Sequence, residues 1–502
     1  MNKPADLKLD TVPFFIGGRK LDAAPRYGEV FDPASGQVTK RVAFADAKIV
    51  DQAVQAAAAA LPAWRDTPPL RRARIMQEFL ALLKKNQKQL AELVTSEHGK
   101  TLPDAMGSVQ RGIEVVEFAC GIPHLLKGEY SENVGTQVDT HTVRQPVGVC
   151  AGITPFNFPV MVPLWMFPVA IACGNTFVLK PSEKVPSASV LMAELFKQAG
   201  LPDGVLNVVH GDKAAVDSIL NHAQVNAVSF VGSTPIAKYI YESCAKTGKR
   251  VQALGGAKNH AIVLPDADLE FAADALIGAA YGSAGERCMA ISAVVAVGSA
   301  GDPLVKLLEK KAKAIKVGPG TQEGVDMGPL VTAEHRNKVA GFIATGKKEG
   351  AKVVLDGSQA PVKDGFFLGT TLFDHVTPQM EVYKNEIFGP VLVVLRASSL
   401  EEAIALVNAN PYANGTAIFT ESGGAARRFE NEIQVGMVGI NVPIPVPVAF
   451  YSFGGWKNSL FGDLHVHGVE GVKFYTRTKV ITTRWPHQDT PRGGGFTMPT
   501  LG

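Results

Sequence analysis

The feature that most constrains the fold of this chain is a regular alternation of short apolar runs with longer segments of helical spacing. Four such runs are apolar along nearly their whole length: GVCAGIT (148–154), NTFVLKP (175–181), VLNVVHG (205–211) and AVSFVGS (227–233). Because neither face of such a strand is suited to water, these runs are typical of a parallel sheet with helices on both faces. The pattern predicts an α/β fold that contains a Rossmann-like nucleotide-binding domain.

A second series of apolar runs begins near Asn259 and also alternates with helical segments; it includes HAIVLP, SAVVAVG, VVLDG, PVLVVLRA and TAIFTES. These runs predict a second α/β domain. Between the two series, LGGAK (254–258) interrupts both patterns, and a glycine pair is typical of a loop. We therefore predict a nucleotide-binding domain over 1–124 and 147–255, and a catalytic domain over 256–455.

Near its C-terminus the chain contains a segment that alternates like a strand, VKFYTRTKVITTRW (472–485). No strand-like segment follows it, so we expect it to join another sheet, with a second subunit as one source of that sheet. We assign 125–146 and 472–487 to a small β segment for oligomerisation and 488–502 to a tail. The expected assembly is a homodimer or a homotetramer.

One stretch of the chain resembles a membrane span: FPVMVPLWMFPVAIAC (158–173) has 16 uncharged residues. It is shorter than the roughly 20 residues that a helix needs to cross a bilayer, and its three prolines would leave backbone groups unpaired in lipid. We predict a buried helix here and no membrane partner.

Charge and cysteine content exclude several classes of protein. The net charge is only +3, from 50 basic and 47 acidic residues, and no basic stripe indicates a nucleic-acid partner. The five cysteines are widely spaced without a C-x-x-C pair, which favours free thiols in a reducing compartment. The N-terminal segment lacks the apolar core of a signal peptide. We therefore expect a cytoplasmic protein with no metal site.

Cys288, in the sequence SAGERCMA, is the first candidate for chemistry. The small residues around it predict a helix start, where backbone amides and the positive helix end would favour the thiolate. A single cysteine taken without context is more often a small buried apolar residue. The neighbouring motifs distinguish these two interpretations.

Six motifs occur in order along the chain: GITPFNFPV (152–160), KPSE (180–183), FVGST (230–234), LGGAKN (254–259), GERC (285–288) and NEIFGPV (385–391). In content and order they resemble the aldehyde dehydrogenase superfamily, over nearly the whole chain. The resemblance implies that Cys288 is the nucleophile and that the Asn157 amide belongs to the oxyanion hole. A thiolate adds to an aldehyde to give an alkoxide, and each N–H donor stabilises that charge by about 3 kcal/mol. Taken alone, Asn157 would be a turn residue.

The resemblance also implies NAD as the cofactor. Lys180 and Glu183 match the residues that hold the adenosine ribose, and a carboxylate there favours NAD over NADP because it repels a 2′-phosphate. In isolation these two residues would form a surface ion pair. Glu386 matches the residue on the nicotinamide ribose, and Ser233 lies where a helix N-terminus meets the pyrophosphate. Further cofactor contacts implied by the resemblance are Thr154, Phe156 and Phe388.

Two positions depart from the family pattern. Ala237 replaces a second glycine that many members have near the pyrophosphate. Ala253 replaces the glutamate with which hydrolytic members activate water for thioester hydrolysis. Bulk water has a pKa of about 15.7 and needs that help, whereas a thiol with a pKa of about 8.5 does not. The second replacement therefore favours transfer of the acyl group to coenzyme A as a co-substrate.

Further strings, GAKNHAIV, GWKNSLFGDLHVHG and FYTRTKVITTRWP, resemble the methylmalonate-semialdehyde dehydrogenase branch of the family. That branch converts malonate or methylmalonate semialdehyde, with loss of the carboxylate, into acetyl- or propionyl-coenzyme A. Arg111 and Arg287 match its pair of carboxylate-binding residues, a role that suits the planar guanidinium. By sequence alone, Arg111 is equally compatible with an exposed position on a helix.

Two alternatives stay open at the level of sequence. One is a hydrolytic NAD-dependent enzyme that acts on another small aldehyde acid. The other is a catalytically silent member of the same fold, with a structural or nucleotide-binding role. The presence together of Cys288, Asn157, Lys180 and Glu386 argues against the silent protein, which would need none of them.

Overall fold

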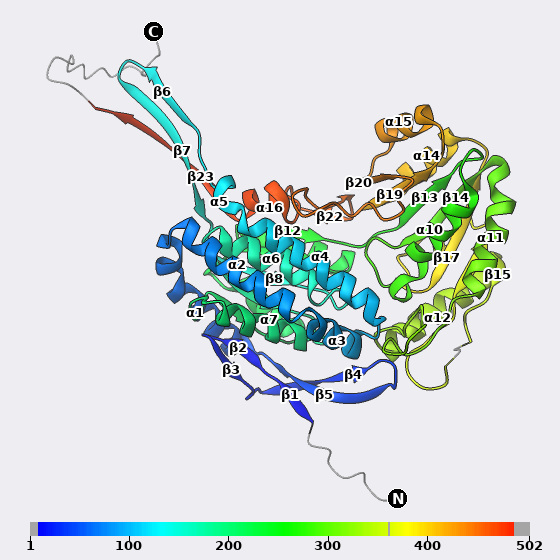
Figure 1. Ribbon diagram of the computed structural model, residues 1–502, viewed down its shortest axis with the longest axis horizontal. Helices are drawn as coiled ribbons and strands as arrows, with labels where there is room; N and C mark the ends of the chain where they lie inside the picture. Colours follow the sequence, from blue (N-terminus) through cyan, green and yellow to red (C-terminus); the bar gives the residue numbers. More distant parts are fainter. Residues whose placement is uncertain (1–8, 360–361, 486–502) are drawn as a thin grey trace, which may run out of the picture.

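The computed structural model describes residues 9–359 and 362–485. Figure 1 shows two α/β domains beside each other and a narrow β ribbon that projects from the first. The first domain contains an eight-stranded sheet in the order β22-β12-β11-β8-β9-β10-β2-β3. Its five central strands are parallel: β8 (Val149–Ile153), β9 (Thr176–Lys180), β10 (Leu206–Val208), β11 (Val225–Val231) and β12 (Arg250–Leu254). This strand order is that of a Rossmann domain, which confirms the prediction.

Antiparallel strands lie at both edges of this sheet. β2 (Phe14–Ile16) and β3 (Arg19–Leu21) extend it beyond β10, and β22 (Leu460–Phe461) pairs with β12. A separate three-stranded sheet is formed by β1 (Asp10–Val12), β5 (Gln37–Phe44) and β4 (Arg26–Asp32). The apolar-run pattern does not predict these strands, because they are short or contain many polar residues.

The central strands of the first sheet are buried on both faces. Cys150 and Phe177 pack into one hydrophobic cluster, whereas Ala151 and Val178 pack into another on the opposite face. The first cluster includes α2 (Pro69–Lys85), α3 (Gln87–His98), α4 (Leu102–Cys120), α6 (Met161–Ala172) and α7 (Ser187–Gln198). The second includes α1 (Ala47–Asp66), α8 (Lys213–Asn221) and α9 (Thr234–Lys246). Burial on both faces explains why these runs are apolar throughout.

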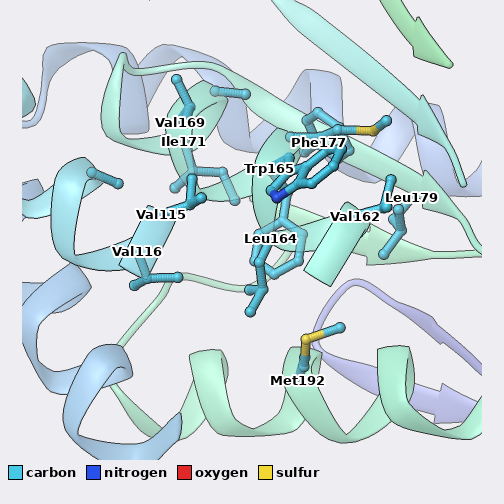
Figure 2. Close-up of a cluster of buried hydrophobic side chains, with 14 of the residues drawn as sticks. Val115, Val116, Val162, Leu164, Trp165, Val169, Ile171, Phe177, Leu179 and Met192 are labelled. Atoms are coloured by element: carbon cyan, nitrogen blue, oxygen red, sulfur yellow. The ribbon is translucent and has the colours of Figure 1, made fainter. Parts of the chain in front are cut away.

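The predicted buried helix is α6, in which every residue is buried. Figure 2 shows Leu164 and Trp165 of α6 packed among side chains of α4 and the sheet. The helices α4 and α6 approach closely at Gly112, where a Cβ atom would lie 2.8 Å from Leu164 Cδ1 and 3.1 Å from Met161 Cα. Within residues 9–359 and 362–485, no helix combines the length and the apolar character needed to cross a membrane.

The second domain contains a seven-stranded sheet in the order β15-β16-β17-β14-β13-β19-β20, in which six strands run parallel and β15 pairs antiparallel with β16 at one edge. The strands are β13 (Asn259–Val263), β14 (Ile291–Val297), β15 (Lys352–Leu355), β16 (Thr371–Asp374), β17 (Val391–Ala397), β19 (Gly415–Phe419) and β20 (Met437–Ile440). One face packs on α10 (Leu269–Tyr281), α11 (Gly301–Lys313) and α12 (Ala333–Lys348), and the other on α14 (Leu400–Ala409) and α15 (Gly423–Glu432). The second α/β unit is therefore confirmed.

The projecting ribbon is a three-stranded antiparallel sheet of β6 (Tyr130–Gly135), β7 (Val138–Pro146) and β23 (Thr476–Arg484), with β7 in the middle. The C-terminal strand thus pairs along its whole length with a strand of its own chain. It begins later than residue 472, because residues up to Phe474 belong to α16 (Gly468–Phe474). Residues 486–502, which include the predicted tail, lie outside the described residues.

Candidate active site

Cys288 lies in a turn between the short 3-10 helix η1 (Gly282–Gly285) and strand β14. The expectation of a helix start at Cys288 is wrong, because the residues after it form a turn that leads directly into β14. The strand predicted from SAVVAVG is confirmed, since β14 pairs with strands on both sides. The half-buried thiol lines two cavities at once. One has a volume of about 490 Å³, and the other, of about 20 Å³, is bordered by Glu386 and Phe388. Cys288 therefore connects two compartments.

The pKa of Cys288 is raised rather than lowered. Burial raises the pKa of the thiol to about 12, and the nearby Glu386 carboxylate adds to this shift. The backbone N–H groups of Cys288 and Met289, together with Lys100, act in the opposite direction and are outweighed. The thiol is therefore protonated at neutral pH in this state, contrary to the expectation of a favoured thiolate.

A strained turn precedes the segment 286–290, which contains the predicted nucleophile Cys288 and is called the nucleophile loop below. Ser283, Ala284 and Gly285 all have positive φ angles, of 55°, 52° and 74°, in a region that residues other than glycine rarely enter. At Gly285 a Cβ atom would lie 2.2 Å from the Gly389 carbonyl oxygen, so this turn packs directly on the loop before β17. Backbone strain of this kind persists only where the surrounding structure imposes it.

Asparagine side chains hold the backbone of the same loop. Asn157, which follows β8, is buried and donates from Nδ2 to the Glu286 carbonyl at 2.9 Å. Asn259 and Asn414 donate to the Cys288 carbonyl at 2.8 and 3.2 Å. The Asn157 amide nitrogen carries a second N–H. The structure thus brings the predicted amide donor next to the loop of the predicted nucleophile.

The large cavity is lined by both predicted arginines as well as by Cys288. Arg111 comes from α4, and Arg287 comes from the nucleophile loop. Most of the remaining wall is apolar and is formed by Phe158, Met161, Trp165, Met289, Ile444 and Phe453. Two guanidinium groups among apolar walls suit a small anion that has a short carbon chain.

Four predicted cofactor residues lie at one edge of the first sheet. In open α/β sheets, ligands bind at the carboxyl ends of two neighbouring strands whose connections run in opposite directions, here β8 and β11. Thr154 follows β8, and Ser233 is the N-cap of α9, where its side chain makes no capping hydrogen bond. Lys180, at the end of β9, is buried and donates to the Gly211 carbonyl at 2.7 Å and to Glu183 at 3.2 Å.

The other predicted cofactor residues are Glu386, Phe388 and Phe156, and the first two border a cavity that Cys288 also lines. Glu386 accepts a hydrogen bond from the Ala257 amide at 2.9 Å. Burial raises the pKa of Glu386 to about 7, against the opposing effects of that hydrogen bond and of Lys258. Phe156 and Phe388 meet edge to face, with ring centroids 5.9 Å apart. Glu386 and Phe388 border the small cavity, which Cys288 and Arg287 also line, whereas Arg111 lines only the large one of these two cavities.

Ala253, which departs from the hydrolytic pattern, is fully buried in β12. It lies between Phe230 and Phe461 of the adjacent strands and shares a hydrophobic cluster with Ala237. Neither alanine supplies a group that is able to activate water.

The sequence interpretation missed a buried group of ionisable side chains near Cys288. The Glu286 carboxyl group is fully buried, with Oε2 3.4 Å from His98 Nε2 and Oε1 3.5 Å from His335 Nε2. Burial raises the pKa of Glu286 well above its usual value and lowers that of His98, so each favours its neutral form. These residues come from the nucleophile loop, α3 and α12, and no sequence spacing connects them.

Asp104 is another residue that the sequence interpretation missed. It lines the large cavity and pairs with Arg287, with 2.8 Å between Oδ1 and the guanidinium. Asp104 lies two helical turns before Arg111, and residues seven apart share one face of a helix. This spacing was a signal available in the sequence.

The sequence model of the aldehyde dehydrogenase family matches residues 21–481. A malonate-semialdehyde dehydrogenase from Pseudomonas aeruginosa is 58% identical over 497 residues, which cover 98% of this chain and 100% of the relative. The structure of a methylmalonate-semialdehyde dehydrogenase from Oceanimonas doudoroffii matches with a TM-score of 0.94 and 56% identity, over 95% of this chain and 99% of that one. A Sinorhizobium meliloti protein assigned to the same enzyme type, solved with NAD, matches with a TM-score of 0.95 and 53% identity, over 96% and 99%. With these motifs, this fold and these matches, the chain belongs to the aldehyde dehydrogenase family.

Proposed function

We propose that this protein oxidises malonate or methylmalonate semialdehyde with NAD and transfers the acyl group to coenzyme A. The observation that carries the proposal is the single cavity that joins the Cys288 thiol to Arg111 and Arg287. In this cavity the aldehyde of the substrate would react at the thiol while its carboxylate contacts a guanidinium. Both ends of the substrate then lie in one cavity, so its carbon chain is short. The names of the similar proteins support the same choice of substrate.

NAD fits the residues at the carboxyl edge of the first sheet. The Lys180 ammonium and the Glu183 carboxylate suit the ribose hydroxyls, and the N-terminus of α9 at Ser233 suits the pyrophosphate. Glu386 would hold the second ribose beside Cys288. When bound, NAD supplies the acceptor for the hydride that leaves the aldehyde carbon. The similar structure solved with NAD supports this assignment.

The residues of the chain divide the chemistry between them. After the Cys288 thiol has passed its proton to water, the thiolate adds to the aldehyde, and the Asn157 amide together with the Cys288 backbone N–H stabilises the alkoxide. Loss of the hydride leaves a thioester on Cys288. Arg111 and Arg287 hold the substrate carboxylate, which leaves as CO2, and a proton from solvent takes its place on the carbon. The coenzyme A thiolate then attacks the thioester carbonyl and displaces the Cys288 sulfur, which gives acetyl- or propionyl-coenzyme A.

Ala253 supports acyl transfer over hydrolysis. Its buried methyl group cannot activate water, whereas a thiol such as that of coenzyme A is a few per cent thiolate at neutral pH. The alternative function is hydrolytic oxidation of another small aldehyde acid. All five cysteines are free thiols, which supports a reducing compartment such as the cytoplasm. We also propose that the β ribbon joins subunits into a homodimer or homotetramer.

Rapid mixing of the enzyme with NAD and malonate semialdehyde tests this function. Without coenzyme A, we expect a burst of NADH of about one per active site and then a slow phase, because the thioester persists. Coenzyme A should accelerate the slow phase at least about tenfold. The Cys288→Ala control should show no burst but still bind NAD in a calorimetric titration. Fast steady turnover to the free acid without any added thiol would support the hydrolytic alternative and contradict the proposal.

A further inference from the structure

Several groups hold the guanidinium of Arg111. It donates to the Glu114 carboxylate and to the Pro447 carbonyl, both at 2.6 Å, and to the Val446 carbonyl at 3.4 Å. These acceptors come from α4 itself and from a segment more than 300 residues away in the chain. Loss of any one of them leaves the others to orient the side chain.

Arg287 is held in a different way. Among the described residues its one close hydrogen-bond acceptor is Asp104 Oδ1, at 2.8 Å, because the contact with the Gly278 carbonyl is 3.5 Å long and weak. The side chains of Asp104 and Arg287 are 19% and 22% exposed, so water competes little for this pair. A charge-assisted hydrogen bond in such a setting is a strong polar contact. The direction of Arg287 in the cavity therefore depends on Asp104.

Asp104 is kept ionised by two cations. Lys100 is fully buried, with Nζ 3.9 Å from Asp104 Oδ2 and 4.1 Å from the centroid of the Phe158 ring. Burial by itself would raise the pKa of Asp104, but Lys100 and Arg287 outweigh burial and bring the pKa below its usual value. Asp104 is therefore an anion at neutral pH and remains a partner for Arg287.

We propose that Asp104 is a positioning residue that aims Arg287 at the carboxylate of the substrate. This inference rests on the proposed function, because Asp104 would act through an arginine that binds that carboxylate. A guanidinium has five N–H donors, so the bond to Asp104 leaves donors for a ligand in the cavity. When the substrate carboxylate leaves as CO2, Asp104 still neutralises Arg287, and the enclosed guanidinium keeps a counter-ion.

Asp104→Ala and Glu114→Ala form a matched pair, because each removes one acid that pairs with one arginine of the cavity. Asp104→Ala should raise KM for malonate semialdehyde about tenfold, with kcat changed less than about threefold. For propanal, which has no carboxylate, KM should stay within about twofold. Glu114→Ala should change KM for malonate semialdehyde less than about threefold, since the two carbonyls still hold Arg111.

A double variant shows whether Asp104 acts through Arg287. Asp104→Ala combined with Arg287→Ala should have the same KM for malonate semialdehyde as Arg287→Ala alone. Asp104→Asn keeps an oxygen acceptor for Arg287, so its KM for malonate semialdehyde should lie close to that of the unmodified enzyme. If Asp104→Ala does not fold, Asp104→Asn takes its place in the comparison. Three results would overturn the positioning role. These are an equal change of KM for both aldehydes in Asp104→Ala, no change of KM for either aldehyde, and an effect on KM that adds to that of Arg287→Ala in the double variant. An unchanged KM in Arg287→Ala would instead overturn the proposed recognition of the carboxylate.

Discussion

At the scale of single residues, burial of the Cys288 thiol predicts slow reaction with alkylating agents. Its pKa of about 12 lies far above neutral pH, and only the thiolate is an effective nucleophile. Inactivation of the free enzyme by iodoacetamide should therefore accelerate about tenfold per pH unit from about pH 7 to 9, without a plateau.

The matched control is Cys288→Ala, which reports alkylation at Cys120, the other half-buried cysteine. Burial raises the pKa of Cys120 to about 11, so alkylation of Cys120 should also be slow. An inactivation rate that levels off below pH 8 would show a stabilised thiolate in the free enzyme and contradict the prediction.

At the scale of elements, Gly112 sets the distance between α4, which carries Arg111, and α6. Gly112→Ala would place a Cβ atom 2.8 Å from Leu164 Cδ1 and 3.1 Å from Met161 Cα. Overpacking costs about 1 to 3 kcal/mol, and this range begins at the roughly 1 kcal/mol that alanine gains over glycine in a helix and extends above it. We expect a lower melting temperature and a higher KM for malonate semialdehyde, because Arg111 moves with its helix.

Gly107→Ala is the control on the same helix, because a Cβ atom there would have no atom within 4 Å. Its melting temperature should stay the same or rise, since only the helix propensity changes. Differential scanning fluorimetry compares the two variants directly. Equal melting temperatures would show that α4 and α6 tolerate a wider spacing.

The sequence predicts best the elements whose residues are all buried to the same degree along the whole length. β8 and β9 are buried on both faces, so an unbroken apolar run identifies them. β12 and β4 contain polar as well as apolar residues, so no unbroken apolar run marks them in the sequence. The sequence around Cys288 gives a mixed result: the apolar run SAVVAVG correctly identifies β14, whereas the small residues beside Cys288 wrongly indicate a helix start.

The candidate site is predictable where its residues lie within contiguous motifs, as Cys288 and Asn157 do. Asp104 is absent from those motifs, although its helical spacing from Arg111 could have identified it. The contact of Glu286 with His98 joins two segments far apart in the chain, and it exists only after the chain has folded. The roles of these residues stay predictions until the variants are measured.

At the scale of the whole molecule, the β ribbon leaves the outer edge of β23 unpaired among the described residues (Figure 1). Val480 in this strand is 63% exposed, and an edge strand with an exposed apolar side chain favours pairing with another chain. If the ribbon joins subunits, burying this valine contributes about 1.5 to 3 kcal/mol per copy. Val480→Asp should therefore shift the mass measured by light scattering towards that of smaller assemblies.

Val353→Asp is the control for that experiment. Val353 is also exposed, at 41%, but it lies in β15 at the edge of the second sheet, in the other domain. This variant should keep the mass of the unmodified protein. If Val480→Asp also keeps it, the ribbon is not the contact that holds the subunits together.

The chain leaves the first sheet after β12 and returns to it only at β22, which pairs with β12 at Ala253 and Leu254. The strands of the second domain's sheet all lie between these two in the sequence. A ribosome that adds 5 to 20 residues per second needs roughly 10 to 40 s for the about 200 residues that separate them. During that time β12 has an open edge that neighbouring nascent chains are able to pair with. We therefore expect the newly made first domain to depend on chaperones until translation of the second domain is complete.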